Sequence, residues 1–134
     1  MAYVRILDSH GKKLEHIGKS QDVVIQVKTK RVGLPLEGHI GIGLMRADGQ
    51  LVFGTSTKLA GLKPILFTGE QVTELVIPSL PLLYGTYQVK TAVADQHTLR
   101  CFCEHITDAI SISCERPELG MFWMEHDWRI PNTS

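Results

Sequence analysis

The chain has 134 residues, of which 43% are hydrophobic and 21% charged, and these values are typical of one soluble globular domain. Its 14 basic and 14 acidic side chains balance, which disfavours a domain that holds nucleic acid or a membrane surface through a basic patch. No segment has the layout of a signal peptide or the roughly 20 apolar residues of a membrane span. The sequence therefore predicts a soluble, cytoplasmic protein.

Apolar and polar residues alternate with a period of two along most of the chain, and this pattern is typical of β-strands. Residues 3–7 form the first expected strand. Residues 22–29 form the second, in which the three odd-numbered apolar residues share one face. Residues 31–38 are expected to form a loop, because Gly33 and Pro35 interrupt the pattern.

The next two strands are joined at Asp48-Gly49, which is the strongest hairpin signal in the chain. In the first of them, apolar residues alternate with Gly41 and Gly43. If the apolar residues face the core, the two glycines face away from it together with His39. A glycine inside a strand often marks the close approach of a ligand or of another backbone.

Further segments continue the strand pattern as far as the C-terminal region, namely residues 70–78, 86–95, 99–105, 109–115 and 121–130. Turn signals separate the strands about every 8–12 residues. Only residues 15–20 and 57–64 are expected to hold a short helical turn each. The sequence therefore predicts one all-β domain over residues 1–134, an antiparallel immunoglobulin-like β-sandwich of about eight or nine strands.

Sequence signatures of catalysis and of cofactor binding are absent. There is no phosphate-binding G-x-x-x-x-G-K-[ST] motif, no G-x-S-x-G nucleophile motif and no H-E-x-x-H motif. The six histidines are scattered, and no spacing identifies a catalytic pair of carboxylates. We therefore expect no enzyme and no cofactor, although a small β-sandwich hydrolase or lyase that acts on sugars stays an alternative.

The three cysteines are Cys101, Cys103 and Cys114, and an odd count without a C-x-x-C motif favours a reducing compartment. Cys101 and Cys103 would share a face of a strand and, with His105, suggest a zinc site. Structural zinc ligands normally have two to four residues between them, on a turn. We therefore expect buried or half-buried strand cysteines and no metal.

The order of these motifs resembles the C-terminal domain of Wzt-type ATP-binding subunits of the ABC transporters that export O-antigen polysaccharide. The segment "LVFGTST" at residues 51–57, directly after the Asp-Gly turn, is similar to the family's "vFGtnT" signature, and "LPLLYG" at residues 80–85 is similar to its "LPLLPG"-like turn. The resemblance extends over about residues 20–130. The chain departs from the family pattern in lacking the nucleotide-binding half and in having Tyr84 where a proline is common.

The resemblance implies a β-sandwich that binds the non-reducing end of a lipid-linked O-polysaccharide at the inner face of the bacterial inner membrane. It also implies the transporter ATPase domain and the membrane subunit as partners, and a homodimer that in some members exchanges the last strand. Aromatic residues near the C-terminus are candidate anchors of that dimer interface, and these are Phe122, Trp123 and Trp128.

The side chains expected to face outward beside the glycines form a candidate carbohydrate-binding groove. Such a groove would offer a floor of small residues, fixed polar groups for sugar hydroxyls and an aromatic ring for the apolar face of a sugar. The candidate residues are His39, Gly41, Gly43, Gln88, Lys90, Arg100, Phe102 and Glu104. Two alternatives stay open: the glycines make room for a packed neighbour, or the domain is a structural dimerisation or docking module without a ligand of its own.

Overall fold

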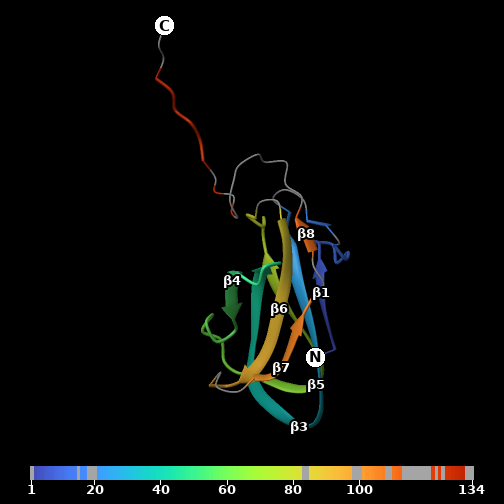
Figure 1. Ribbon diagram of the computed structural model, residues 1–134. Helices are drawn as coiled ribbons and strands as arrows, with labels where there is room; N and C mark the ends of the chain where they lie inside the picture. The colour runs from blue at the N-terminus through green and yellow to red at the C-terminus, as the bar shows by residue number, and fades with distance from the viewer. Residues whose placement is uncertain are drawn as a thin grey trace.

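The residues that the structure, a computed structural model, describes form eight strands and no helix (Figure 1). These residues are 2–14, 16–17, 21–82, 85–97, 101–107, 110–112, 122, 124 and 126–131. The strands are β1 (Tyr3–Leu7), β2 (His16–Ile17), β3 (Val23–Arg46), β4 (Leu51–Ser56), β5 (Ile65–Ile77), β6 (Gly85–Asp95), β7 (Cys101–Ile106) and β8 (Ile110–Ile112). The predicted all-β fold is confirmed.

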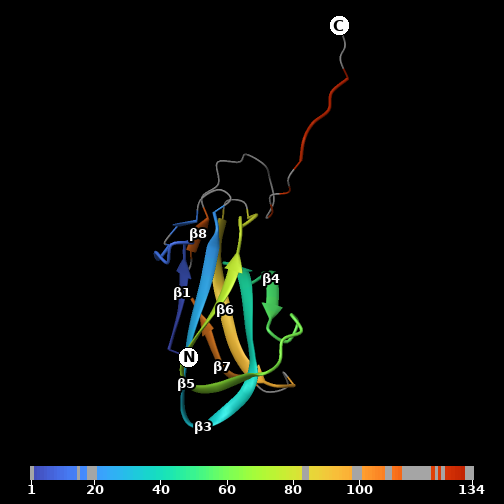
Figure 2. The ribbon, with the colours of Figure 1, turned by 180° about the vertical axis from the view of Figure 1, so that it is seen from behind.

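Strand β3 is 24 residues long and belongs to both layers of the sandwich. Its first part pairs with β1 and β5, and its second part pairs with β4 and β6, all antiparallel. Figure 2 shows how β3 and β5 curve together at the lower end of the molecule. Only β2 and β8 pair in parallel among the described strands.

The predicted loop at residues 31–38 is wrong, because this segment is a bend within β3. The register against β5 shifts between Arg31 and Leu36, and Gly33 takes a φ of 100° that favours glycine. The Arg31 Nε donates a hydrogen bond to the Leu34 carbonyl oxygen (2.7 Å). The glycine and the proline therefore turn the strand into the second layer without ending it.

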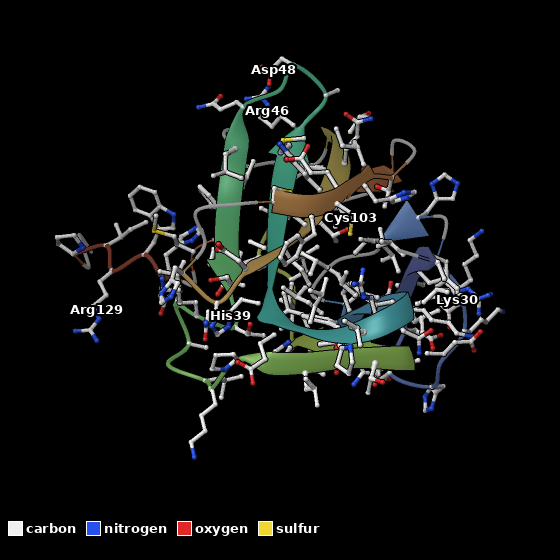
Figure 3. The ribbon with its side chains drawn as sticks, turned by 90° about the horizontal axis from the view of Figure 1, so that it is seen from below. Lys30, His39, Arg46, Asp48, Cys103 and Arg129 are labelled. Carbon is white, nitrogen blue, oxygen red and sulfur yellow. The ribbon has the colours of Figure 1, made fainter. Side chains whose placement is uncertain are left out.

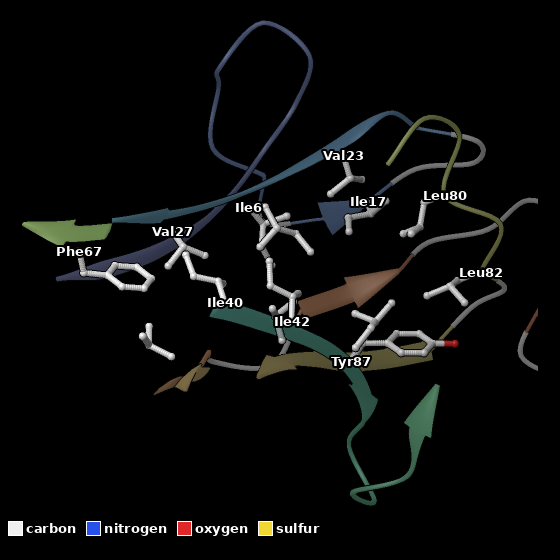
Figure 4. Packing of buried hydrophobic residues seen from close by; sticks show 14 residues of the cluster. Ile6, Ile17, Val23, Val27, Ile40, Ile42, Phe67, Leu80, Leu82 and Tyr87 are labelled. Carbon is white, nitrogen blue, oxygen red and sulfur yellow. The ribbon is translucent and has the colours of Figure 1, made fainter. Parts of the chain in front are cut away.

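The core lies between the two layers and consists of alternate residues of the strands (Figure 4). The predicted inward face of the second expected strand is confirmed, since Val23, Ile25 and Val27 are at most 3% exposed. On β6, Tyr87 and Val89 are also buried, and burial raises the pKa of the Tyr87 phenol. Alternation along each strand thus sorts apolar side chains inward.

The hairpin at Asp48-Gly49 is present, and its tip is labelled in Figure 3. The amide of Gly49, whose φ is 89°, donates to the Arg46 carbonyl oxygen (2.9 Å), and the amide of Gln50 donates to Asp48 Oδ1 (3.1 Å). These bonds close the turn between β3 and β4.

Two short predictions outside the strands have different outcomes. Residues 57–61 do form turns, with the Ala60 amide donating to the Ser56 carbonyl oxygen (3.0 Å). In the segment 15–20, the described residues 16–17 form strand β2 instead of a helical turn. No helix in the described part of the chain is long and apolar enough to cross a membrane.

The expected last strand at residues 121–130 is also wrong for its described part. Phe122 makes a single β-bridge to Leu82, and residues 124 and 126–131 lie outside any strand. In Figure 1 the red segment that contains residues 126–131 extends away from the sandwich. This segment therefore pairs with no strand of its own layers.

Candidate functional site

Small residues form a row across three neighbouring strands on the outer side of the second layer. Gly41 of β3 is paired with Ser56 of β4 on one side and with Ala92 of β6 on the other, and Ala92 is paired with Glu104 of β7. The adjacent row is Gly54, Gly43, Lys90 and Ile106. We call these two rows the glycine face.

The glycine face is turned away from the core, as the sequence predicts. Ile40, Ile42 and Leu44, which alternate with the glycines, are at most 9% exposed and belong to the core cluster. Successive side chains of a strand point to opposite faces. Gly41 and Gly43 therefore lie on the outer surface.

The outer surface has more free space at Gly41 than at Gly43. A Cβ atom added to Gly41 would meet only the Thr55 carbonyl oxygen at 3.8 Å and the Ser56 Cβ at 3.9 Å, which are ordinary contact distances. A Cβ on Gly43 would lie 3.1 Å from Leu51 Cδ1. The Leu51 side chain therefore lies against Gly43, and the open floor of the face is at Gly41.

Polar groups of the predicted groove border this floor. Lys90 Nζ lies 3.8 Å from Glu104 Oε1, and the two side chains are 42% and 54% exposed. The Gln88 Nε2 donates to the Thr107 carbonyl oxygen (3.3 Å), while Thr107 Oγ1 accepts from the Val89 amide (3.0 Å). Gln88, Lys90 and Glu104 are thus brought together on β6 and β7 with partly fixed orientations.

His39 does not contribute an exposed ring to the face, contrary to expectation. It is 3% exposed, and its Nδ1 shares a hydrogen bond with Thr57 Oγ1 (2.8 Å). The same oxygen accepts a hydrogen bond from the Ile40 amide (3.2 Å). The turn that follows β4 covers the imidazole, and the pairing of β4 with β3 brings this turn over it. His39 is therefore a buried, hydrogen-bonded residue at the end of the glycine face.

Phe102 also leaves the expected face, because β7 contains a bulge. Val93 pairs with Cys103 and Ala94 with Cys101, so Phe102 is the extra residue between them. A bulge changes the face to which the following side chains point. Phe102 consequently lines a cavity between the layers instead of the glycine face, and Arg100 lies outside the described residues.

The same bulge separates the two cysteines, which were expected to share a face. Cys103 is half-buried against the core, as expected, whereas the expectation is wrong for Cys101, which is exposed. The Cys101 thiol lies 3.3 Å from the Cys103 carbonyl oxygen and 3.8 Å from Glu104 Oε1. Desolvation of the sulfur, and next the negative charge of Glu104, raise the pKa of the Cys101 thiol. In the described part of the chain, no group of three or more His, Cys, Asp or Glu residues could hold a metal ion.

An apolar cavity of about 300 Å³ is bordered by β4, by the C-terminal ends of β3 and β5 near Leu44 and Ile77, and by residues 80–82. The sequence pattern does not predict this cavity, at which Phe53 of β4 is 51% exposed. Its lining consists almost entirely of large apolar side chains, including Leu44, Val52, Phe53, Ile77, Leu80, Leu82 and Phe122. Two large apolar side chains follow Phe122 in the sequence and are about four-fifths exposed, namely Trp128 (79%) and Ile130 (82%). Trp123 lies outside the described residues.

These features define a β-sandwich domain with an open sheet face of small residues bordered by charged side chains. A family model described as the Wzt C-terminal domain matches residues 1–124, and the chain therefore belongs to this family. The family predicted from the sequence is confirmed, and membership is consistent with a role in O-antigen ABC transport.

A solved structure shows the same fold. It is described as "Crystal structure of the C-terminal domain of wzt" and is similar with a TM-score of 0.72, over 96% of this chain and 81% of that chain, at 15% sequence identity. In all, 13 solved chains match this one. No curated protein sequence matches it.

Proposed function

We propose that this domain recognises the non-reducing end of a lipid-linked O-antigen polysaccharide and presents it for export by an ABC transporter, without catalysing a reaction itself. Its partners are then the transporter ATPase domain and membrane subunit, at the cytoplasmic side of the inner membrane. The observation that carries this proposal is the row Ser56, Gly41 and Ala92 across three strands, beside the charged pair of Lys90 and Glu104.

The chemistry of the glycine face suits a sugar chain. The small residues let a pyranose ring approach the backbone of the sheet closely. Leu51 and Ile106 are 60% and 50% exposed on either side of the floor, and each offers an apolar contact to the C–H face of a ring. The ammonium group of Lys90 donates to sugar hydroxyls and the carboxylate of Glu104 accepts from them.

The sharpest test is to fill the floor without damaging the fold. Because a Cβ atom at Gly41 meets only ordinary contacts and the position lies on the outer face of the sheet, Gly41→Val should fold with a melting temperature within a few degrees of the parent protein. It should weaken the binding of O-polysaccharide fragments at least about tenfold, because its branched Cβ occupies the place of the ring. Affinity would be measured by NMR titration with such fragments on the isolated chain.

Val72→Leu is the matched control, since Val72 lies on the outer side of the first layer, opposite Lys28, and is 53% exposed. This variant adds volume to the other outer surface and should bind as the parent protein does. If no fragment shifts the resonances of Gly41, Lys90 or Glu104 in the parent protein, the glycine face is not the binding surface.

A second candidate function, a homodimerisation module with an exchanged C-terminal segment, is favoured by a separate observation. Residues 126–131 extend away from the sandwich and carry exposed Trp128 and Ile130. The apolar cavity bordered by Phe53 and by Phe122, which precedes this segment by four residues, has room for large side chains. We propose that this segment of one copy covers the apolar cavity of a second copy, because burying such side chains offsets the entropic cost of association.

Light scattering distinguishes the dimerisation function from glycan recognition. In light scattering of the whole chain, Trp128→Ala combined with Ile130→Ser should convert a dimer into a monomer and leave the sandwich folded. A parent chain that is monomeric at high micromolar concentration would rule out the dimer. The Gly41→Val variant is the control here, because it should affect glycan binding alone.

A further inference from the structure

A second cavity, of about 190 Å³, lies between the layers at the end where β3 bends. Figure 3 views the molecule from this end, with Cys103 and Lys30 labelled. The residues that border it come from the first layer (Thr29, Lys30, Arg31 and Phe67) and from β6 and β7 (Val93, Phe102 and Cys103). On this measure a single water molecule needs about 10–15 Å³, so the cavity has room for several waters or for one sugar-sized group.

The Thr29 hydroxyl is a buried polar group without a hydrogen-bond partner in the described part of the chain. Thr29 is 6% exposed, and its side chain makes no hydrogen bond to any residue that the structure describes. Buried hydroxyls normally have a partner, because an unsatisfied one costs free energy. Since Thr29 borders the cavity, the missing partner is expected there.

The charge around the cavity is positive. Arg31 uses only its Nε, toward the Leu34 carbonyl oxygen, and no carboxylate lies within ion-pair distance of its guanidinium among the described residues. Lys30 likewise has no ion pair in the described chain, because Glu70, its cross-strand neighbour, is paired with Lys28 (3.1 Å). No Asp or Glu in the described ranges borders this cavity.

Phe102 adds an aromatic wall. The bulge in β7 turns this residue from the outer face into the cavity, where it is still 37% exposed. Bulges often redirect a side chain at a binding site. A cavity bordered by an aromatic residue, an arginine and a buried threonine suits a ligand that has both an apolar face and a negatively charged group.

We infer that this cavity binds an acidic sugar residue through its carboxylate or phosphate group. The Arg31 guanidinium forms the paired hydrogen bonds to the oxyanion, the Thr29 hydroxyl donates a further bond, and Phe102 contacts the ring of the sugar. This inference rests on the proposed function in one respect: it takes the acidic residue to belong to the same polysaccharide that the glycine face recognises.

The direct test uses three small probes, namely glucuronate, glucose 6-phosphate and uncharged glucose, at equal concentrations and ionic strength. At least one of the two anions should shift the backbone amide resonances of Thr29, Arg31 and Phe102, and glucose should not. A response to glucuronate alone identifies a carboxylate site, and a response to glucose 6-phosphate alone identifies a phosphate site. The inference is overturned if neither anion shifts these resonances, or if glucose shifts them equally.

Variants locate the interaction. Thr29→Val keeps the shape of the side chain, so it should bind the responding anion about tenfold more weakly and have a higher melting temperature than the parent chain. Arg31→Met should lose at least as much affinity, whereas Arg46→Met, on the distant hairpin, should lose none. An unchanged affinity in Thr29→Val overturns the inference even if Arg31→Met fails to fold.

The two proposals can fail separately. If O-polysaccharide fragments shift Gly41 and Lys90 while the acidic probes leave Thr29 and Arg31 unmoved, only the anion site is refuted. If the acidic probes bind and no polysaccharide shifts the glycine face, the glycan function of that face is refuted and the anion site stands.

Discussion

Lys90 and Glu104 are diagonal neighbours on β6 and β7, with Nζ and Oε1 3.8 Å apart at the border of the glycine face. Both side chains are about half exposed (42% and 54%). An exposed ion pair of this kind contributes little to stability, typically about 0–1 kcal/mol. The pair is therefore better placed to contact a ligand than to hold the two strands together.

Removing one charge of this pair should separate the two roles. We expect Glu104→Gln to change the free energy of unfolding by less than about 1 kcal/mol and to weaken polysaccharide binding severalfold, because an uncharged amide is a weaker acceptor for sugar hydroxyls. Chemical denaturation and NMR titration measure the two effects. Glu70→Gln, which removes the partner of Lys28 on the other layer, is the matched control and should leave binding unchanged.

Two glycines of β3 should respond in opposite ways to the same substitution. A Cβ at Gly38 would collide with the backbone carbonyl oxygen of Ala94, whereas one at Gly41 would not. We expect Gly38→Ala to destabilise the fold by more than about 2 kcal/mol, and Gly41→Ala to be neutral or stabilising by about 0.5 kcal/mol. Urea denaturation of both variants would contradict this if the two free energies of unfolding changed equally.

The buried contact between His39 and Thr57 should be important for stability. The Thr57 hydroxyl serves both the His39 ring and the Ile40 amide, so Thr57→Val leaves two buried polar groups without a partner. We expect a loss of about 1–3 kcal/mol in the free energy of unfolding, measured by thermal and chemical denaturation. Thr57→Ser keeps the hydroxyl and should recover most of the loss; equal losses in both variants would show that the methyl group matters instead.

Cys101 should react slowly with alkylating reagents despite its exposure. Its pKa is raised by desolvation of the sulfur and by the Glu104 carboxylate, so the reactive thiolate is scarce at pH 8 and increases only as the pH rises further. Glu104→Gln removes one of these causes and should speed the reaction at pH 8. Iodoacetamide labelling of the Cys101 peptide, followed by mass spectrometry, measures the rate. A rate at pH 8 equal to that of an unstructured cysteine peptide would contradict the expectation.

The features that the sequence predicts correctly depend on local periodicity. Val23, Ile25 and Val27 are buried because alternation assigns them to one face, and Tyr87 is buried for the same reason. The Asp48-Gly49 turn is also a local signal, because the glycine supplies a positive φ. Since Gly41 and Gly43 follow the same alternation, their outward orientation could be predicted as well.

The errors occur where pairing between distant segments decides the outcome. Gly33 and Pro35 look like a loop, yet β5 continues to pair on both sides of the bend and keeps β3 whole. The bulge that redirects Phe102 exists only in the register between β6 and β7, so the sequence of β7 alone does not reveal it. Phe53 alternates toward the inner side, but there it borders the apolar cavity and stays 51% exposed.

The continuity of β3 also sets a fixed interval along any bound polymer. Thr29 precedes the bend, Arg31 lies at its start and Gly41 follows it. One continuous strand, paired with β5 before and after the register shift, therefore sets the distance between these positions. A glycan long enough to reach both the cavity and the glycine face would bind more tightly, because one molecule would make two attachments. A shorter glycan would bind at only one of the two sites. Affinity should accordingly rise in a step, and not gradually, as sugar units are added.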